Sequence, residues 1–582
     1  MRPETRKCKN CENDFTIEVE DFAFYEKIKV SPPTWCRECR QMRRMSFRNE
    51  RILFKRKDDR TGKDMISIFS PDSPHKVYDH EYWWDGGFNP MDYGRDFDFS
   101  KTFFDQFKDF LEEIPWPSLR IESCENSEYN NDVGKSKNLY LCARTHSCSN
   151  VLYSYRANSS RDCADCMQVF EDSEFLYECI ECISCTNSSY LYFCENCANS
   201  DMLWNCKNCL DCFMCTNLRN KQYCYKNLQL TREEYQKKIA EFNSGSFAQK
   251  EEALKEFEEI KLKTIRRNLN LVSCVNSSGD NLVDCKNCFL SFGAKNAENS
   301  RYLWDNGPYK DCMDSYSGGR NCELVYECTA TSASYNCKFC NRANECRDAE
   351  YSIFIKNSGN LFGCIGLHNK EYCILNKQYS ETEYKKLKEK IIEHMRQSGE
   401  YGEFFPMKLS NFAYNETVAQ EYFPKNKEGA EKQGLRWRDP EEKDYKPTVP
   451  SGSIPDEIKF INSEILKETF GCVHEGKCAH GCTKAFKIIE RELEFYKMRN
   501  LALPRLCPNC RHYERLAKLN PQKLWPRECM CAGGESTNRI YKNTISHQLH
   551  GVNPCGKKFE TSFSPDRKEI VYCEDCYKQE IY

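Results

Sequence analysis

Hydrophobic and polar residues follow three different patterns along this chain. Near the N-terminus, apolar residues alternate with polar ones from Phe15 to Val19, which is the two-residue period of half-buried strands and predicts two β-hairpin arms between Phe15 and Val30. In the middle, segments such as Tyr177-Glu-Cys179 and Tyr192-Phe-Cys194 repeat an aromatic residue and a cysteine two positions apart. Residues 100–114 and 247–266 place apolar side chains at helical spacing. Together the patterns predict a mostly β protein with capping and connecting α-helices.

The cysteines of the middle region set the length of its repeat. Ten cysteines from Cys179 to Cys224 are separated only by 3 or 9 positions, so equivalent positions recur every 12 residues. Short strands at even spacing, edged by Asn and Ser, indicate a parallel β-solenoid. Twelve residues form either one small coil or half of a 24-residue coil. Because residues i and i+2 share a face of a strand, each aromatic residue is expected to lie on the same face as its cysteine.

This cysteine-rich parallel β-solenoid is predicted to be duplicated. Leu218–Cys224 matches Leu367–Cys373 at an offset of 149 residues. Each copy ends in a capping-box sequence, Thr231-x-x-Glu234 or Ser380-x-x-Glu383, which marks the start of a helix. We expect these helices to cover the open sheet edge at the end of each solenoid.

Cysteines at the two ends of the chain have the spacing of zinc ribbons. Two CxxC pairs are separated by 24 residues in the first ribbon, and paired knuckles of this kind close a tetrahedron around Zn²⁺. The same plan recurs near the C-terminus, where nine identities at an offset of 471 mark an internal duplication. The predicted ligands are Cys8, Cys11, Cys36 and Cys39 in the first ribbon, and Cys478, Cys482, Cys507 and Cys510 in the second.

A third, shorter ribbon ends the chain and contains Cys555, Cys573 and Cys576. A structural zinc site needs a fourth ligand. We select His550, which precedes Cys555 by five residues, and the competing candidates are Cys529 and Cys531. The three ribbons predict three structural zinc ions per chain.

A fourth copy of the ribbon is predicted to have lost its metal. The segments Phe69-Ser-Pro-Asp72 and Val77-Tyr78 match segments of the third ribbon. Asp79 and Tyr82 stand where that ribbon has Cys573 and Cys576. No upstream CxxC pair exists either, so we expect a ribbon-shaped hairpin without a metal ion.

These patterns divide the chain into ten segments. The terminal ribbons flank the two solenoid copies. The predicted boundaries are 1–52 for the first ribbon with a basic helix, 53–99 for the metal-free ribbon, 100–120 for a linker helix, 121–229 for the first solenoid copy, 230–270 for a helical insert, 271–379 for the second copy, 380–398 for a capping helix, 399–455 for an extended connector, 456–530 for a helix with the second ribbon and 531–582 for the third ribbon.

Composition narrows the class of protein. The 40 cysteines among 582 residues are several times the ordinary share, and no apolar leader precedes them. The default compartment is therefore the reducing cytoplasm, where cysteines form metal sites or buried thiols more often than disulfides. For the solenoid cysteines, the alternatives are a buried ladder, a zinc cluster or redox relay, and disulfides. No apolar run approaches a membrane span.

Two functions from different classes fit the sequence. Residues 37–57 carry nine Arg or Lys against two Glu, a local cationic segment of the kind that contacts RNA or ribosomal phosphates. The alternatives for this segment are a solvated helix face and an intramolecular partner among the acidic segments. The candidate residues are Arg40, Arg43, Arg44, Arg48, Arg51, Arg511, Arg515 and Lys518. Alternatively, the acidic solenoid surface is a scaffold for protein partners. No catalytic set, phosphate loop or small-molecule site emerges, so we do not expect an enzyme.

The chain resembles a family of uncharacterised bacterial multi-zinc-ribbon proteins. The resemblance rests on the CxxC pairs ending at Cys11 and Cys39, on Leu503–Arg511, on Tyr414–Phe423 and on Phe559–Tyr577. The first ribbon is also similar to a widespread probable zinc-ribbon domain. Asp79 and Tyr82 depart from the ribbon pattern. The resemblance implies structural metal sites but no established activity.

Overall fold

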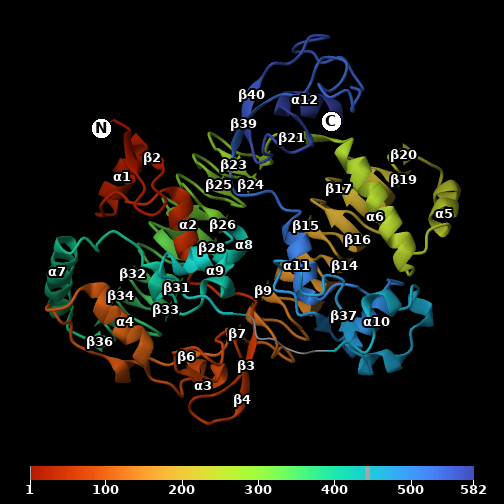
Figure 1. The fold of residues 1–582 in the computed structure, drawn as a ribbon. Helices are drawn as coiled ribbons and strands as arrows, with labels where there is room; N and C mark the ends of the chain where they lie inside the picture. The colour runs from red at the N-terminus through yellow and green to blue at the C-terminus, as the bar shows by residue number, and fades with distance from the viewer. Residues whose placement is uncertain (1, 440–445) are drawn as a thin grey trace. The chain divides into compact units, whose positions relative to one another are not determined.

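The computed structural model describes residues 2–439 and 446–582 and confirms the predicted fold class. The chain forms two compact units, and each contains one solenoid copy and two ribbons. Unit 1 combines the residues up to Leu119 with Leu269–Asp439, and unit 2 combines Arg120–Asn268 with the residues from 446 to the end. The first two ribbons therefore pack with the second solenoid copy, and the last two pack with the first copy (Figure 1).

The ribbons share one plan, a short hairpin followed by a helix that starts at the second knuckle. In unit 1 the elements are β1 (Glu4–Lys7), β2 (Asp14–Ile17), α1 (Val19–Lys27), α2 (Arg37–Met45), β3 (Phe54–Lys57), β4 (Asp64–Ser67), β5 (Val77–Tyr78) and α3 (His80–Trp84). In unit 2 they are β37 (Phe470–Gly471), β38 (Ala485–Phe486), α10 (Glu490–Met498), α11 (Pro508–Leu516), β39 (Trp525–Glu528), β40 (Lys558–Thr561), β41 (Ile570–Tyr572) and α12 (Glu574–Ile581).

The remaining helices connect the ribbons and the solenoids. They are α4 (Phe103–Glu113), α5 (Arg232–Ala240), α6 (Phe247–Leu262), α7 (Glu381–Gln397), α8 (Val418–Tyr422) and α9 (Lys427–Glu431), with 3-10 helices at Pro90–Tyr93, Met407–Leu409, Tyr414–Glu416, Ser451–Ser453, Ile458–Phe460 and Ser463–Lys467. Among the residues that the structure describes, no helix is long and apolar enough to cross a membrane.

Each solenoid copy is a stack of short strands (Figure 1). The first copy contains β7 (Ile121–Glu122), β8 (Asn131–Gly134), β9 (Ala143–His146), β10 (Ser149–Leu152), β11 (Tyr155–Ala157), β12 (Arg161–Ala164), β13 (Met167–Phe170), β14 (Glu174–Tyr177), β15 (Ile180–Ile183), β16 (Thr186–Tyr192), β17 (Asp201–Trp204), β18 (Leu210–Thr216), β19 (Gln222–Tyr225) and β20 (Leu228–Gln229). The second contains β22 (Leu271–Val272), β23 (Gly279–Asp280), β24 (Leu282–Val283), β25 (Ser291–Phe292), β26 (Trp304–Asn306), β27 (Tyr309–Lys310), β28 (Met313–Gly318), β29 (Cys322–Glu323), β30 (Tyr326–Thr329), β31 (Asn341–Asn344), β32 (Arg347–Glu350), β33 (Ile353–Lys356), β34 (Gly359–Phe362), β35 (Glu371–Ile374) and β36 (Lys377–Gln378).

The register shows that twelve residues make one complete coil. In parallel pairs, Leu203 lies opposite Cys215, and Leu361 lies opposite Cys373. The repeat read from the cysteines is therefore the whole coil, and the 24-residue alternative is wrong. One coil in the first copy is longer by a residue, because Arg161 pairs with Glu174.

Corners in the left-handed backbone region turn this small coil. From Asp132 to Asp165, every third residue has a φ between 50° and 60°. Most side chains avoid this region, which costs about 1–2 kcal/mol per residue, whereas Asn and Asp visit it more readily. Three-residue sides joined by such corners give a twelve-residue coil four sides.

Hydrogen bonds between stacked corner side chains offset part of the free-energy cost of the left-handed backbone. The amide nitrogen of Asn126 donates to the Asn138 side chain at 3.1 Å, and the next links run from Asn138 to Asn150 and from Asn150 to Asp162, each at 2.9 Å. Amide groups that repeat every coil hydrogen-bond to the coil above and below. The asparagines of the repeat therefore stabilise the corners and also make the surface polar.

The residue after each corner points into the coil. Cys182, Cys185, Ser188, Leu191 and Cys194 are all 0–1% exposed. A side of three residues spans roughly 10 Å, so the interior admits mainly small side chains. Cysteine fits because it behaves as a small hydrophobe with a weak donor, and the Cys182 sulfur lies 3.4 Å from the Leu191 carbonyl oxygen.

The solenoid cysteines thus form the predicted buried ladder. Burial raises the pKa of Cys142 to about 12 and that of Cys148 to about 11, which keeps both thiols protonated near neutral pH. Within the described residues, no group of candidate metal ligands contains a solenoid cysteine, and every cysteine is free of disulfides.

The prediction that each aromatic residue lies on the same face of a strand as its cysteine is wrong. Cys179 belongs to the core inside the coil, whereas Tyr177 packs outside it against Phe495 and Tyr496. The intervening residue, Glu178, has a φ of 52°. A corner between two positions cancels the alternation of a regular strand, so the two side chains lie on opposite sides of the coil wall.

Helices close the end of each solenoid as predicted. Both capping boxes are formed, by Thr231 with Glu234 and by Ser380 with Glu383. Tyr235 of α5 lies against Tyr223 with ring centroids 5.9 Å apart, and α7 makes the equivalent contact through a pair of tyrosines 149 residues later. These contacts cover the apolar edge of the last coil.

Three other boundaries differ from the sequence prediction. The second hairpin arm expected between Ile17 and Val30 is the helix α1, which has a capping box at Glu18. The linker helix begins after Thr102 rather than after Ser100. The segment predicted as an extended connector, 399–455, contains short helices, while its residues 440–445 lie outside the described residues.

Replacing Cys182 by alanine tests the buried ladder. We expect a loss of about 1 kcal/mol in the free energy of unfolding, because the substitution leaves a small cavity in a packed interior. The metal content of the protein should stay the same, as measured by elemental analysis beside a denaturant titration. A Cys182→Ala variant that loses a metal ion would contradict this assignment.

Candidate metal centres

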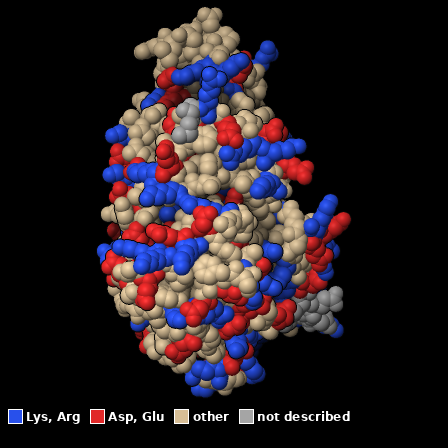
Figure 2. All heavy atoms as spheres, turned by 90° about the vertical axis from the view of Figure 1, so that its left-hand side faces the viewer, with Lys and Arg blue, Asp and Glu red and all other residues tan. Residues whose placement is uncertain are grey.

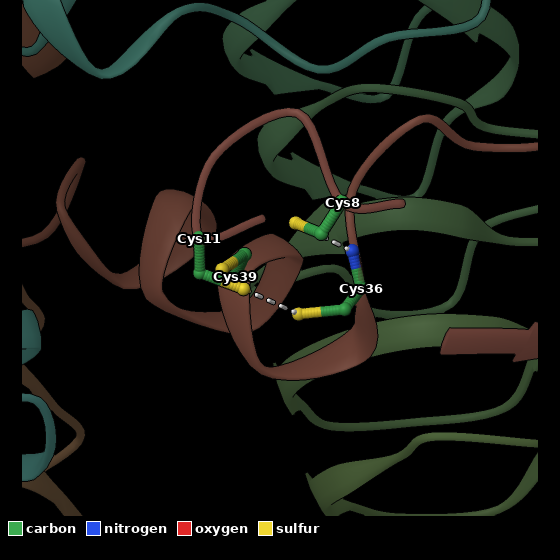
Figure 3. A group of neighbouring side chains, drawn as sticks. All are labelled: Cys8, Cys11, Cys36 and Cys39. Carbon is green, nitrogen blue, oxygen red and sulfur yellow. Dashed lines mark hydrogen bonds between the residues drawn. The ribbon is translucent and has the colours of Figure 1, made fainter. Parts of the chain in front are cut away.

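The first ribbon brings its four predicted cysteines together. The turn after β1 carries Cys8 and Cys11, and the start of α2 carries Cys36 and Cys39. Their sulfur atoms lie within 4.8 Å of one another, and Figure 3 shows them converging on one point from the two knuckles. The backbone amide of Cys36 donates to the Cys8 sulfur at 3.2 Å. Such bonds stabilise thiolates, and four thiolates in this arrangement can hold one metal ion.

The second ribbon uses a different cysteine from the one predicted. The group consists of Cys472, Cys482, Cys507 and Cys510, so Cys472 replaces Cys478 in the predicted set. Cys472 directly follows the first hairpin strand, as Cys8 does, and accepts a hydrogen bond from the Cys507 amide at 3.3 Å. The sequence comparison selected Cys478 because its CxxxC spacing imitates the first knuckle.

The third ribbon obtains its fourth ligand from Cys529, one of the two competitors of His550. The group consists of Cys529, Cys555, Cys573 and Cys576. Cys529 directly follows strand β39, and its sulfur accepts a hydrogen bond from the Cys573 amide at 3.2 Å. A cysteine directly after the first strand is therefore common to all three metal ribbons. This signal was present in the sequence, but the long knuckle insertions of the last two ribbons hid it.

The fourth ribbon has the same hairpin and helix, with other residues at the positions of the cysteines. Asp79 caps the N-terminus of α3, the position that a cysteine occupies at the start of α2 and α12, and accepts a hydrogen bond from the Glu81 amide at 3.0 Å. Asp58 follows the first strand in the place of Cys8, and the Thr61 hydroxyl donates to it at 2.5 Å. Hydrogen bonds between Asp58 and Thr61 thus replace metal ligation. Among the described residues, no candidate metal group contains Asp79.

The basic helix of the first ribbon faces the solenoid. In unit 1, α2 lies beside β28 (Figure 1). The Arg40 guanidinium lies 2.7 Å from the Asp314 carboxylate. Arg43 and Arg44 approach Glu327 at 3.0 and 2.8 Å. These five side chains are at most 3% exposed, so the arginines predicted to contact phosphates are ion-paired inside the protein.

The neighbouring arginines are also engaged within unit 1. Arg48 pairs with Glu50 at 2.6 Å, and Arg51 pairs with Glu421 at 3.0 Å. Burial would lower the pKa of Arg43, but the carboxylates of Glu327 and Glu403 outweigh it and raise the pKa above its usual value. The Arg43 guanidinium therefore stays charged although it is removed from water.

Unit 2 repeats this arrangement with equivalent residues. Arg511 pairs with Asp165, and Arg515 lies 2.9 Å from Asp165 and 3.0 Å from Glu178. The offsets are those of the sequence duplications, 471 for the ribbon and 149 for the solenoid. Lys518 lies 3.0 Å from the Tyr192 hydroxyl. Sequence reasoning found both duplications and allowed an acidic partner within the chain, but it did not identify which carboxylates the arginines meet.

The carboxylates in both clusters belong to solenoid corners. Asp165 and Glu178 in unit 2, and Asp314 and Glu327 in unit 1, have φ values between 46° and 55°. A corner projects its side chain outward from the coil, which places two carboxylates on adjacent coils where a ribbon helix can reach both. The residues with the strained backbone are therefore also the residues on which the ribbon helix docks.

Comparisons with known proteins add little to this description. No protein-family model and no curated protein matches the chain. A crystal structure from Desulfovibrio desulfuricans G20, which carries the description acetyltransferase, is similar with 10% identity and a TM-score of 0.10. The similarity covers 41% of this chain and 64% of that one, so the chain spans less than two thirds of that structure. At this TM-score the likeness supports no statement on fold or activity.

Substitution of one candidate ligand should distinguish the three ribbons that have a four-cysteine group from the ribbon that has none. We expect Cys36→Ser to lower the bound metal by one ion per chain, because three thiolates no longer close the tetrahedron. The matched change in the metal-free ribbon, Asp58→Asn, should leave the metal content unchanged. Elemental analysis of the two variants measures both effects, and loss of an ion from the Asp58 variant would contradict the account.

Disrupting one arginine cluster should strongly destabilise its unit. Arg44→Met leaves Glu327 and Asp314 buried with less positive charge, which costs about 3–5 kcal/mol for a buried pair. Arg37→Met, on the same helix but paired with Glu38 near the surface, should cost no more than about 1 kcal/mol. Denaturant unfolding measures both, and equal effects would contradict the importance of burial.

Proposed function

We propose that the protein is a non-enzymatic, zinc-stabilised scaffold that binds a protein partner along one edge of its first solenoid copy. The observation that carries this proposal is the use of the ribbon arginines. Arg44 and Arg515 are at most 1% exposed and contact solenoid carboxylates. In this arrangement the ribbon helices hold the solenoids and do not present their charges to a phosphate backbone.

Zinc is the metal that suits the three four-cysteine groups. It prefers tetrahedral thiolate sites, and such sites are structural because no ligand position is left open for a substrate. All cysteines in the described part of the chain are reduced, which suits the reducing cytoplasm where we place the protein. We assign the ions a role in folding rather than in catalysis.

The surface charges also favour a protein partner over a polyanion. On the face drawn in Figure 2, Lys and Arg atoms are interspersed with Asp and Glu atoms. A nucleic acid needs a continuous positive surface, and a protein partner can match alternating charges. The chain as a whole has a net charge of −3.

The proposed edge is the ladder formed by Asn126, Asn138, Asn150 and Asp162. Beside this ladder, Glu125 lies opposite Lys137 on the next coil, and Arg161 pairs with Glu174 at 2.6 Å on the surface. Because the corners are fixed by the coil below, the polar groups are held in place before binding, which lowers the entropic cost of association. A rigid, regular row of amides is therefore suited to a polar protein interface.

Paired glycine variants test this interface. In the Asn138→Gly and Asn150→Gly double variant, the corners keep a conformation that glycine adopts easily, while the amides are lost. We expect the partner that co-purifies with the tagged full-length protein from its own cells to be depleted at least tenfold in quantitative mass spectrometry.

The matched control changes a different ladder, with Asn196→Gly and Asn208→Gly, which also carries an amide link at 3.1 Å. The partner should still co-purify with this control variant in the same amount as with the unmodified protein. Equal retention by both variants would contradict the proposed edge. Co-purified RNA, with a high 260/280 nm absorbance ratio that high salt abolishes, would instead favour the RNA or ribosome contact predicted from the sequence.

A further inference from the structure

We propose that each of the last two ribbons binds two metal ions that share one cysteine thiolate. A second group of candidate ligands adjoins the four-cysteine group of each ribbon. In the second ribbon it consists of His474, Cys478, His480 and Cys510, and in the third of Cys531, His547, His550 and Cys576. Cys510 and Cys576 each belong to both groups of their ribbon. This proposal is independent of the partner proposed above.

In the second ribbon, the shared sulfur lies between the two groups. The Cys510 sulfur is 3.9 Å from that of Cys472 in the first group and 3.7 Å from that of Cys478 in the second. The Nδ1 atoms of His474 and His480 are buried and have no hydrogen-bond partner. A buried nitrogen without a partner is costly unless it has a ligand, and a metal ion in the second group would satisfy both.

In the third ribbon, the second group is even more compact. The Cys531 sulfur lies 3.4 Å from His547 Nδ1, and His550 Nε2 lies 3.1 Å from that same nitrogen. The His550 Nε2 atom is also 3.3 Å from the shared Cys576 sulfur. Four donor atoms therefore meet with room for one ion between them.

In His547 and His550, the ring nitrogen that faces away from the candidate metal group has a hydrogen-bond acceptor, which favours metal binding by the other nitrogen. His547 Nε2 lies 2.8 Å from the Glu580 carboxylate, and His550 Nδ1 lies 2.7 Å from the Asn553 carbonyl oxygen. An acceptor at one ring nitrogen fixes the proton there and leaves the other nitrogen free for a metal ion. Glu580 thus orients a ligand and does not itself belong to the group.

Insertions in the first knuckle explain why only these ribbons have a second group. Cys8 and Cys11 are separated by two residues, whereas nine lie between Cys472 and Cys482, and 25 between Cys529 and Cys555. The inserted residues supply the new ligands. In both insertions a ligand stands two positions after the first cysteine, as His474 or Cys531.

The first ribbon provides an internal comparison. Two positions after Cys8 it has Asn10, whose amide nitrogen donates to the Cys39 sulfur at 3.1 Å. Cys39 is the equivalent of the shared cysteines Cys510 and Cys576. A hydrogen-bond donor in the first ribbon thus stands where the other two ribbons place a metal ligand.

The charge balance favours two ions in each of these ribbons. One divalent ion with four thiolates carries a net charge of −2. A second divalent ion adds one new thiolate, Cys478 or Cys531, and two neutral imidazoles, so the pair carries −1. Two histidines and two cysteines are a common tetrahedral set for zinc, and thiolates select zinc over harder cations. The inference therefore raises the expected zinc content from three ions per chain to five.

Metal analysis of the full-length protein tests this proposal directly. We expect five zinc ions per chain, and X-ray absorption should show a zinc–zinc distance of about 3.5–4 Å, typical of paired metal sites. Fewer than five ions, or five ions without a zinc–zinc distance, would overturn the proposal.

Two double variants locate the additional ions. His474→Ala with His480→Ala, and His547→Ala with His550→Ala, should each lower the content from five ions to four. The control His394→Ala, outside every ligand group of the described residues, should retain five. A histidine double variant that also retains five would overturn its ligand assignment.

A spectroscopic measurement keeps the proposal testable if a variant does not fold. In the unmodified protein loaded with ¹¹³Cd, two pairs of resonances should show mutual cadmium–cadmium coupling through the shared sulfur, and a fifth should be uncoupled. Five uncoupled resonances would overturn the shared thiolates.

Discussion

The buried contact between ribbon arginines and solenoid carboxylates is the interaction on which the rest of this structure depends. Two guanidinium groups of a ribbon helix meet two carboxylates on neighbouring coils, in unit 1 through Arg44 and in unit 2 through Arg515. Charges removed from water are stable only when each has its partner in place. The ribbon must therefore hold its helix rigidly, and the cysteine group at the first turn of that helix would do so by holding a metal ion. The coil holds the carboxylates rigidly as well, because they belong to corner residues.

This dependence explains why the chain combines two unusual cysteine patterns. A twelve-residue coil has a narrow interior, which it fills with thiols and with aliphatic side chains such as Leu191 and Leu361. Its outer aromatic residues, such as Tyr177, gain their burial by packing against a ribbon. The ribbons are small, and three of them place four cysteines where a metal ion would add stability. Each part thus lacks stability that the other provides, and the two duplications preserve the contact between them.

Much of the fold could be predicted from the sequence, because the spacing of cysteines reflects coil length and knuckle geometry directly. The solenoid, its duplication, the two capping boxes and the ribbon shape of the segment around Asp79 follow from local patterns. Spacing did not identify Cys472 and Cys529, because insertions separate them from the knuckle that they complete. The sequence also left the partner of the arginines open, because a cationic helix has the same sequence whether it meets phosphates or carboxylates. Only the folded chain brings Arg44 to Glu327, about 280 residues away.

Hydrogen–deuterium exchange on the metal-replete full-length protein is the most direct test of this account. Backbone amides of α2 and α11 should be protected as strongly as those of the solenoid strands on which they dock. Chelation of the metal should release both helices, while strands far from them, such as β19 and β35, stay protected. Fast exchange of α2 and α11 in the metal-replete protein would show that the arginines are free, and would contradict the central claim.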